Sequence, residues 1–274
     1  MSLLDRTNLL ITPNGVKSGK LFSVIPSNGS GDCTVVRNTT STKINSSGFI
    51  ETVAINTPRL NYESLAGNPA ILVEPQSTNL FTNNEAVTSN FWTNGTVSDS
   101  LIASPIQNVN YSSMRLLNSD IYRFYRLSIP TENTKIYTAS IFLKYVNSRY
   151  VHFRIERSST SVGICFDLIN RVFTTGYYDG AQVSLAPISA SVNGDRVSFS
   201  FAATSGSVNF FLYLSNAVNR TGFTDGEANL TVNLIGTQIE KSSTPTSHIK
   251  TIVTAVTRNA DVITVAPPAG TVKI

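Results

Sequence analysis

The chain has 274 residues, of which 41% are hydrophobic and only 14% are charged, and its formal net charge is +4. This length and apolar content suffice for one large core or two modest ones, which excludes disorder along the whole chain. The few Lys and Arg residues form no run that could neutralise a row of phosphates, so the sequence argues against nucleic-acid binding.

Polar, uncharged residues dominate the composition. Ser, Thr and Asn make up roughly a third of the chain, while the helix-favouring Ala, Glu, Lys and Leu are comparatively scarce. Strands tolerate Thr, and turns favour Ser and Asn, so β structure with many turns is expected. No segment approaches the ~18 apolar residues of a membrane span, and the N-terminus lacks a signal-peptide pattern, so neither membrane insertion nor export is expected.

The two cysteines, Cys33 and Cys165, lie far apart and have no neighbours at metal-ligand spacing. We interpret both as free thiols of a protein made in a reducing cytoplasm. No metal site and no cofactor is predicted.

Residues 1–60 lack sustained periodicity. Turn signals such as Pro13-Asn14-Gly15 and Ser46-Ser47-Gly48 recur at short intervals, and the apolar pieces between them are too small for a core. These residues are expected to form an extended N-terminal arm for attachment or oligomerisation. Residues 61–79 are punctuated by Pro and Asn and are predicted to be a linker or lead-in strand.

Residues 80–260 show strands of five to nine residues separated by turn chemistry, most clearly from about residue 121 onward. In the segment 149–156, Val151, Phe153 and Ile155 share one face and the polar side chains share the other, which is expected to face solvent. The dipeptides Asn193-Gly194 and Asp179-Gly180 favour tight hairpins. The pattern predicts an all-β, antiparallel two-sheet sandwich, followed by a C-terminal extension over 261–274.

Catalytic chemistry finds little support in the sequence. A glycosidase needs two carboxyl groups about 5–10 Å apart, and Glu156 and Asp167, on neighbouring predicted strands, are the least unsuitable pair. Their basic neighbours favour surface ion pairs instead. His152 and His248 lack the Ser and Asp neighbours of a triad. No catalytic residue is assigned and the chain is predicted not to be an enzyme, with a polysaccharide-degrading enzyme as the alternative.

Sugar binding requires only an exposed aromatic ring and a few groups that hydrogen-bond. A tyrosine pair beside the Asp179-Gly180 turn and the lone tryptophan meet this description, as do Tyr122 and Tyr125, although any of these rings could equally belong to the core. The candidate carbohydrate-binding residues are Trp92, Tyr177, Tyr178 and Asp179.

Three stretches resemble a module of phage virion proteins. Residues 69–81, continuing to Phe91 and Trp92, resemble its opening. Residues 137–144 resemble its central strand, and residues 236–240, 245–251 and 256–261 resemble its close. The N-terminal residues 2–6 and 20–26 are similar to leaders of such proteins in phages of Bacteroidota.

The resemblance implies a jelly-roll sandwich of the carbohydrate-binding-module type, carried on a phage particle as a head fibre, capsid decoration or tail fibre. It implies attachment to other virion proteins, of capsid or tail, through the N-terminal arm, and a homo-oligomer, either dimer or trimer. Glycans are a further candidate partner, for adhesion to a host. The family pattern tends to continue past residue 274, so we expect further sequence beyond the C-terminal strand.

Overall fold

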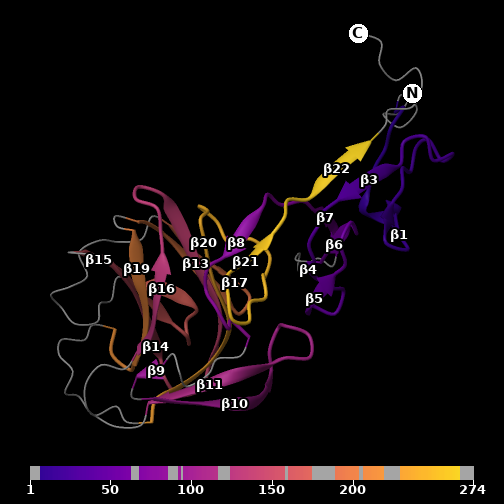
Figure 1. Cartoon of the computed structure of the whole chain (residues 1–274). Helices are drawn as coiled ribbons and strands as arrows, with labels where there is room; N and C mark the ends of the chain where they lie inside the picture. Colours follow the sequence, from indigo (N-terminus) through magenta and orange to yellow (C-terminus); the bar gives the residue numbers. More distant parts are fainter. Residues whose placement is uncertain are drawn as a thin grey trace. The chain divides into compact units, whose positions relative to one another are not determined.

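The computed structural model describes residues 7–62, 68–85, 92–93, 95–116, 124–157, 160–174, 189–203, 206–218 and 229–265. No helical segment among them has the length and apolar character that a membrane crossing requires. The chain divides into two compact units (Figure 1). Unit 1 comprises Met1–Ser77, Thr246–Ile249 and Thr257–Ile274, and unit 2 comprises Thr78–Pro245 and Lys250–Val256.

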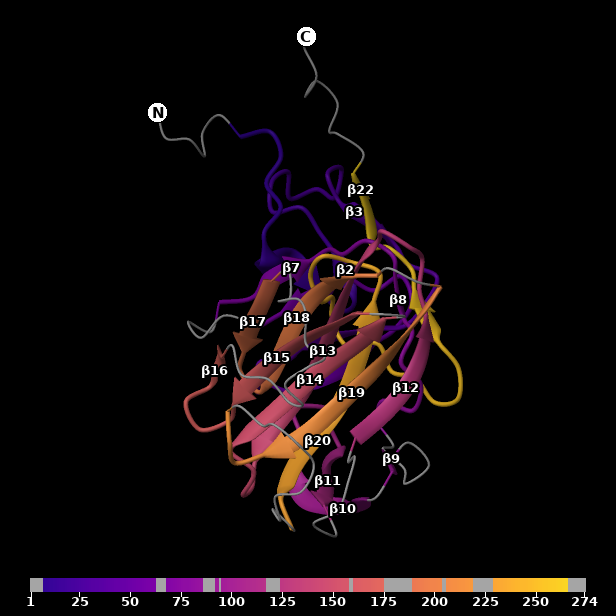
Figure 2. The ribbon, with the colours of Figure 1, turned by 90° about the vertical axis from the view of Figure 1, so that its left-hand side faces the viewer.

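Unit 2 consists of two six-stranded sheets whose strands pair antiparallel. The first sheet has the order β10 (Gly95–Ala103), β11 (Asn110–Leu116), β20 (Thr231–Glu240), β13 (Ile136–Tyr145), β18 (Arg196–Ala202) and β17 (Ser189–Asn193). The second sheet, which faces the viewer in Figure 2, has the order β16 (Val172–Thr174), β15 (Thr160–Asp167), β14 (Tyr150–Arg157), β19 (Ser207–Ser215), β12 (Phe124–Pro130) and β9 (Trp92–Thr93).

The core of unit 2 lies between these sheets. Phe153 of the second sheet lies 5.3 Å, between ring centroids, from Phe199 of the first. Val151, Phe153 and Ile155 are at most 1% exposed and belong to one buried apolar cluster drawn from both sheets. The prediction of an all-β antiparallel sandwich, and of the core face of β14, is therefore confirmed.

The polar faces of the strands depart from expectation. His152 and Arg154, on the side of β14 opposite the core, are 2% and 8% exposed, and Ser198 and Ser200 of β18 are also buried. The prediction that these sides face solvent is wrong for the central strands. The alternation of apolar and polar residues shows which side of a strand is polar. Whether that side is buried depends on chain segments distant in sequence.

The hairpin at Asn193-Gly194 is confirmed. Asn193 pairs with Arg196 across a two-residue turn, and Gly194 has a positive φ of 53°. This backbone conformation strains residues that carry a Cβ and costs glycine little. The other predicted hairpin, at Asp179-Gly180, lies outside the described residues.

Unit 1 is built from short strands. Its largest sheet has the order β1 (Val16–Lys17), β2 (Lys20–Leu21), β3 (Cys33–Val36) and β22 (Val262–Val265), and a 3-10 turn, η2 (Pro13–Gly15), precedes β1. Two-stranded sheets pair β4 (Ser41–Ile44) with β5 (Ile50–Val53) and β6 (Arg59–Asn61) with β7 (Ala70–Leu72). The chain passes between the units within β8 (Ser77–Asn79) and β21 (Val256–Arg258), which pair with each other.

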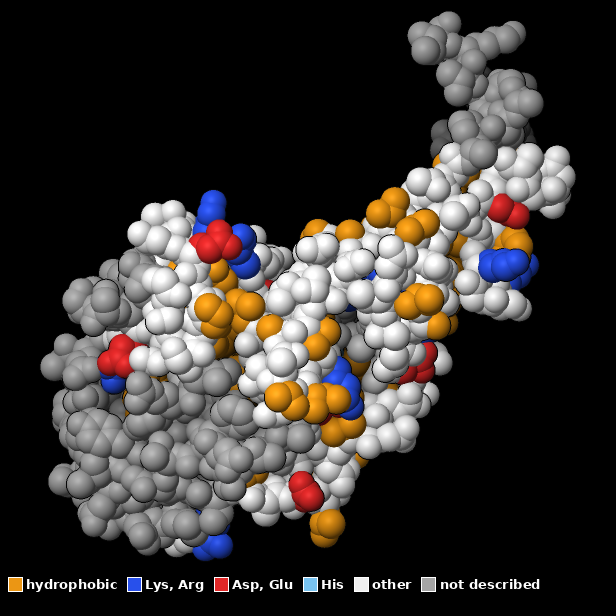
Figure 3. All heavy atoms as spheres, in the orientation of Figure 1, with side chains coloured by type: hydrophobic (Ala, Val, Ile, Leu, Met, Phe, Trp, Pro, Cys, Tyr) orange, Lys and Arg blue, Asp and Glu red, His pale blue; other side chains and the backbone are white. Residues whose placement is uncertain are grey.

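The unit boundaries differ from the predicted domain boundaries. Residues 1–60 are expected to be an extended arm, but their described part, 7–60, contains paired strands, and residues 246–249 and 257–265 group with them in one compact unit. The attachment role of this region stays a prediction. Figure 3 shows a face with scattered charged side chains among many uncharged ones, in keeping with the 14% charged composition.

Candidate functional site

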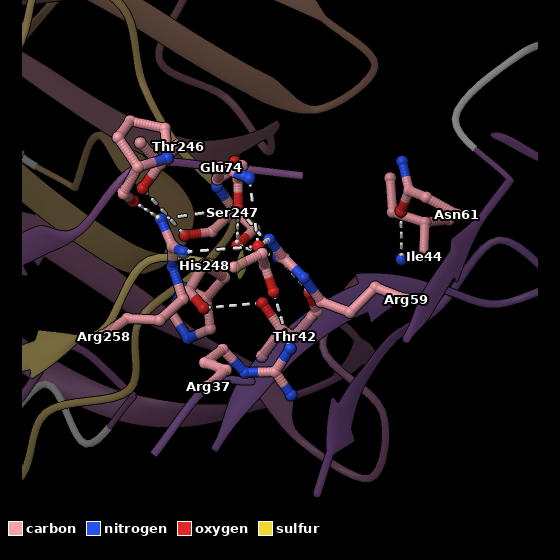
Figure 4. A network of polar contacts seen from close by, with 12 residues as sticks. Arg37, Thr42, Ile44, Arg59, Asn61, Glu74, Thr246, Ser247, His248 and Arg258 are labelled. Atoms are coloured by element: carbon pink, nitrogen blue, oxygen red, sulfur yellow. Dashed lines mark hydrogen bonds and ion pairs between the residues drawn. The ribbon is translucent and has the colours of Figure 1, made fainter. Parts of the chain in front are cut away.

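Unit 1 contains a cluster of charged side chains in its interior. Arg37, Arg59 and Arg258 are each 1% exposed, although arginine is almost never fully buried unless it is paired. Two carboxylates, Glu74 and Asp261, lie among them (Figure 4 shows the surroundings of the three arginines). We call these five residues the arginine cluster.

Asp261 joins two of the arginines. Its Oδ1 accepts a hydrogen bond of 2.7 Å from Arg37 Nη1, and its Oδ2 accepts from Arg59 Nη2. The same Oδ2 also accepts from the backbone N–H of Glu74, at 3.0 Å. One carboxylate thus connects the residue after β3, the first residue of β6 and the backbone after β7.

Glu74 forms the second half of the cluster. Arg59 Nη1 donates to its Oε2 at 2.7 Å. The backbone N–H of Ser247 donates to Oε1 and the Ser247 hydroxyl donates to Oε2, both at 2.7 Å. Arg258 lies 3.5 Å from Glu74 and 3.8 Å from Asp261, and it donates to the carbonyl of Pro75 at 2.9 Å. Arg59 therefore bridges the two carboxylates, and Ser247 attaches the segment 246–249 to them.

The arginines also donate hydrogen bonds to backbone carbonyls of unit 1. Arg37 donates to the carbonyl oxygens of Thr39, Ala54 and Thr57, at 3.0, 2.5 and 3.2 Å. Arg59 donates to the carbonyl of Thr42 at 3.0 Å. Because buried carbonyls need hydrogen-bond partners, these contacts explain how a unit with strands of two to four residues stays compact.

The environment keeps both carboxyl groups of the cluster ionised. Burial raises the pKa of Glu74. Hydrogen bonds from Ser247 and the charges of Arg258 and Arg59 lower this pKa by a larger amount, so it lies below its ordinary value. Burial likewise raises the pKa of Asp261, and hydrogen bonds from Arg59 and Arg37 outweigh it. Neither group is suited to donate a proton as a general acid, which needs a raised pKa. The cluster is built to hold segments together.

The arginine cluster was missed by sequence reasoning, but three of its five residues, and the Ser247 that bonds to it, lie in the stretches that carry the resemblance. Glu74 belongs to 69–81, Ser247 to 245–251, and Arg258 and Asp261 to 256–261. The signal that could have located it is a set of charged residues in otherwise uncharged, turn-rich stretches at both ends of a charge-poor chain.

Other residues of the same stretches meet within unit 2. Asn79 Oδ1 accepts the backbone N–H groups of Phe81 and Ile239, at 3.0 and 3.1 Å. Asn84 and Thr251 bond reciprocally: the Thr251 N–H donates to Asn84 Oδ1 at 2.8 Å, and the Asn84 N–H donates to Thr251 Oγ1 at 3.2 Å. The resembling stretches are thus joined by side-chain-to-backbone hydrogen bonds in each unit.

A second candidate site is the side of β14 and β19 that points away from the core. The strands place three residue pairs directly opposite each other on this side. We call it the outer face of the second sheet, and its residues are His152 opposite Tyr213, Arg154 opposite Phe211, and Glu156 opposite Asn209.

Aromatic and polar groups interact on this outer face. The guanidinium of Arg154 lies 5.5 Å from the centre of the Phe211 ring, and the rings of Phe211 and Tyr213 are 6.1 Å apart and inclined by 19°. Arg154 donates to Glu156 Oε1 at 3.3 Å and to the Tyr213 hydroxyl at 3.5 Å, and Asn209 donates to Glu156 Oε2 at 3.4 Å. Exposure rises from 2% at Tyr213 to 39% for the Glu156 side chain, so the face opens to solvent at its Glu156 end.

The sequence-predicted binding residues are not tested by the structure. Trp92 lies in β9, at the edge of the second sheet, where the structure describes its backbone but not its side chain. Tyr177, Tyr178 and Asp179 lie outside the described residues, as does Tyr122. Tyr125 lies in β12, where its backbone is opposite Leu212 and Trp92.

The suggested carboxyl pair, Glu156 and Asp167, does not come together. In the β14–β15 ladder Glu156 is opposite Ser161, whereas Asp167 is opposite Tyr150, six strand positions and about 20 Å away. Asp167 accepts hydrogen bonds from Arg149 and from the N–H groups of Ile169 and Asn170 in the following turn. These two residues are too far apart for a glycosidase mechanism.

The histidines and Cys165 occupy buried positions. His152 Nε2 lies 3.2 Å from the carbonyl oxygen of Ala217 and 3.8 Å from the Cys165 sulfur. Burial raises the pKa of the Cys165 thiol to about 12, so it is not an activated nucleophile. His248 is buried, and its carbonyl accepts from the Thr42 hydroxyl at 2.6 Å. Within the described residues, no group of three or more His, Cys, Asp or Glu is placed to hold a metal ion.

These features define an all-β protein with an antiparallel sandwich and a second unit closed around buried charges. No family model matches the chain, and no curated protein matches it. Among solved structures it is similar to the enzymatically active domain of tailspike protein 4 from bacteriophage CBA120, with 8% sequence identity and a TM-score of 0.36. The match covers 59% of this chain and 21% of that one.

The matched protein comes from a phage, the source that the sequence resemblance implies. Because the matched domain is enzymatically active, the comparison contradicts the prediction that this chain is not an enzyme, and we do not keep that prediction. A likeness at this level of identity and TM-score assigns no activity to the chain. The Bacteroidota source and the carbohydrate-binding module stay predictions.

Proposed function

We propose that the chain is a component of a phage particle that presents a glycan-recognising jelly-roll sandwich. The observation that carries the recognition part is the outer face of the second sheet, which combines aromatic rings with charged and amide groups on central strands. The particle part rests on the resemblance of residues 69–81, 137–144, 236–240, 245–251 and 256–261 to a virion module. Attachment to other virion proteins, and assembly into a dimer or trimer, are proposed for the region that includes residues 1–60.

The strand order supports jelly-roll connectivity. If β11–β15 and β18–β20 are counted as strands one to eight, the first sheet contains the order 1-8-3-6 and the second contains 2-7-4-5. Several successive strands therefore lie in opposite sheets, and the last strand returns beside the first, as expected when two Greek keys form a double sheet.

The chemistry of the outer face suits a sugar ring. Glu156 can accept hydrogen bonds from sugar hydroxyls, and Asn209 can accept or donate, beside the packed rings of Phe211 and Tyr213, which are 5% and 2% exposed. Rigid strands hold these groups at fixed spacing, which lowers the entropic cost of binding. The exposed Glu156 end is where a glycan would enter, with Arg154 and Phe211 deeper in the sheet.

We expect Glu156→Gln to weaken glycan binding about tenfold or more, since each charge-assisted hydrogen bond contributes roughly 1.5–3 kcal/mol. Binding of the full chain to a glycan array, followed by titration of the best ligand, measures this. The matched control is Glu132→Gln, an exposed carboxylate in unit 2 that pairs with Lys241. An array on which no glycan binds, or equal affinities for the two variants, would remove the outer face as the site.

Cleavage is tested in the same experiment. Polysaccharides incubated with the chain are assayed for new reducing ends, with Glu156→Gln in parallel. Release of reducing ends that the Gln variant abolishes would make the outer face an active site rather than a recognition surface.

The particle assignment has its own test. Mass spectrometry of purified virions that encode the chain should detect it in many copies, because a fibre or decoration protein is repeated on the particle. Its absence from virions would contradict the proposal.

A further inference from the structure

The arginine cluster connects parts of unit 1 that are far apart in sequence. The hydrogen bonds from Arg37 and Arg59 to Asp261 span 224 and 202 residues, and that from Ser247 to Glu74 spans 173. Beside the cluster, β22 pairs with β3 through four residue pairs, from Val262 opposite Val36 to Val265 opposite Cys33. The C-terminal segment of unit 1 is thus held by a short strand pair and by two carboxylates.

The arginine cluster contains more positive than negative charges. In the cluster, three arginines face two carboxylates, and the arginines have 0–1% exposed side chains. Nearby, Lys43 of β4 pairs with Glu51 of β5 at 3.2 Å, and both are partly exposed. The charged groups that pair with the carboxylates are Arg37 after β3, Arg59 in β6 and Arg258 in β21. The segment 246–249 also contributes a buried titratable residue, His248.

Loss of the two negative charges would leave three buried guanidinium groups without counter-charge. A buried charge that loses its partner is strongly destabilising. The short strands of unit 1 have little apolar core to offset this cost, because its largest buried side chains are these arginines. We propose that unit 1 is an acid-opened clasp, in which protonation of Glu74 and Asp261 releases the segments 246–249 and 257–265 from residues 37–75 while unit 2 stays folded.

The sign and range of the pH dependence follow from the two carboxyl groups. Their ordinary pKa values are 4.5 and 3.8, and in the folded unit both are lowered. A depressed folded pKa contributes stability that is fully present above the ordinary value and lost as the pH falls through the folded value. The clasp is therefore closed at neutral pH and opens only below about pH 4.5.

Unit 2 resists the same change for structural reasons. Its described core is an apolar cluster from two sheets. Its Asp167 also has a lowered pKa: burial raises it, and hydrogen bonds from Asn170 and Arg149 outweigh that effect. The partner Arg149, however, has a side chain 42% exposed, so water solvates this arginine when Asp167 is protonated.

Hydrogen exchange of the full chain, read peptide by peptide between pH 7 and pH 2.5 and corrected for intrinsic rates, tests the clasp. Peptides from 37–62, 68–75 and 257–265 should lose protection below about pH 4.5, while β13, β14 and β19 stay protected. The opening constant should rise about tenfold per pH unit for each carboxylate titrated, approaching ~100-fold per unit when both take up protons. Loss of protection in both units at the same pH would overturn the proposal.

The substitution Glu74→Gln tests whether protonation of the carboxylates, and not another group, causes the opening of unit 1. Gln keeps a hydrogen-bond acceptor but cannot take up the proton, so the slope should fall to about tenfold per pH unit. Glu132→Gln, an exposed carboxylate of unit 2, should leave unit 1 unchanged. If Glu74→Gln already opens unit 1 at pH 7, the test uses the unaltered chain alone. The change of its opening constant with pH then gives the number of protons taken up on opening, and one proton or fewer would refute the proposal. Opening near pH 6 with an unchanged slope in Glu74→Gln would assign the effect to His248 and refute it too.

Discussion

Replacement of Asp261 by Ala is expected to destabilise unit 1 by about 3–5 kcal/mol, the usual cost of removing one partner of a buried ion pair. The reason is specific: Asp261 neutralises Arg37 and Arg59, both 1% exposed, and also accepts the backbone N–H of Glu74. The measurement is urea-dependent hydrogen exchange at pH 7, read on peptides of unit 1 and of unit 2 separately.

The control for this change is Asp99→Ala, which removes an exposed aspartate from β10 of unit 2 and should leave both units as stable as the unaltered chain. A loss below about 1 kcal/mol for Asp261→Ala would mean that water enters the cluster and solvates the arginines. In that case the interior of unit 1 would not depend on its charges.

Phe153→Ala is expected to destabilise unit 2 by about 3–5 kcal/mol, as for other large aromatic residues in packed cores. Phe153 is 1% exposed and its ring contacts Phe199 of the opposite sheet and Phe210 of the neighbouring strand, with ring centroids at 5.3 and 6.2 Å. Truncation leaves a cavity where the two sheets meet. Urea denaturation followed by tyrosine fluorescence and circular dichroism reports the change.

The comparison for Phe153 is Leu101→Ala. Leu101 in β10 is 99% exposed, so its truncation removes almost no buried area and should leave the denaturation midpoint unchanged. Equal effects from the two substitutions would show that the packing between the two sheets does not limit the stability of unit 2.

Local chemistry was enough to predict the elements of the sandwich. The period-two pattern of 149–156 identified Val151, Phe153 and Ile155 as core residues, and Asn193-Gly194 identified a hairpin that forms with the expected positive φ. Both inferences depend on neighbours within a few residues, whose side-chain direction and backbone preference are set by the strand and the turn themselves. The resemblance likewise marked the stretches that meet in each unit.

The candidate sites needed the pairing of strands. Glu156 and Asp167 appeared suitable as a pair on neighbouring strands, but the β14–β15 register places them at opposite ends. The register of β14 and β19 places Arg154 opposite Phe211 and Glu156 opposite Asn209, from segments about fifty residues apart. Sequence patterns specify the faces of a strand, and only pairing specifies which faces adjoin.

By itself, the sequence determined that this protein is an antiparallel β-sandwich with little surface charge, because alternation, turn residues and composition act locally. It did not reveal that residues 7–60 contain paired strands of a compact unit, or that polar sides of central strands are buried. The tertiary structure decided both: Arg37 and Arg59 meet Asp261 more than 200 residues later in the chain. A buried charge is stable only beside its partner, and which residue becomes that partner is decided by the path of the chain.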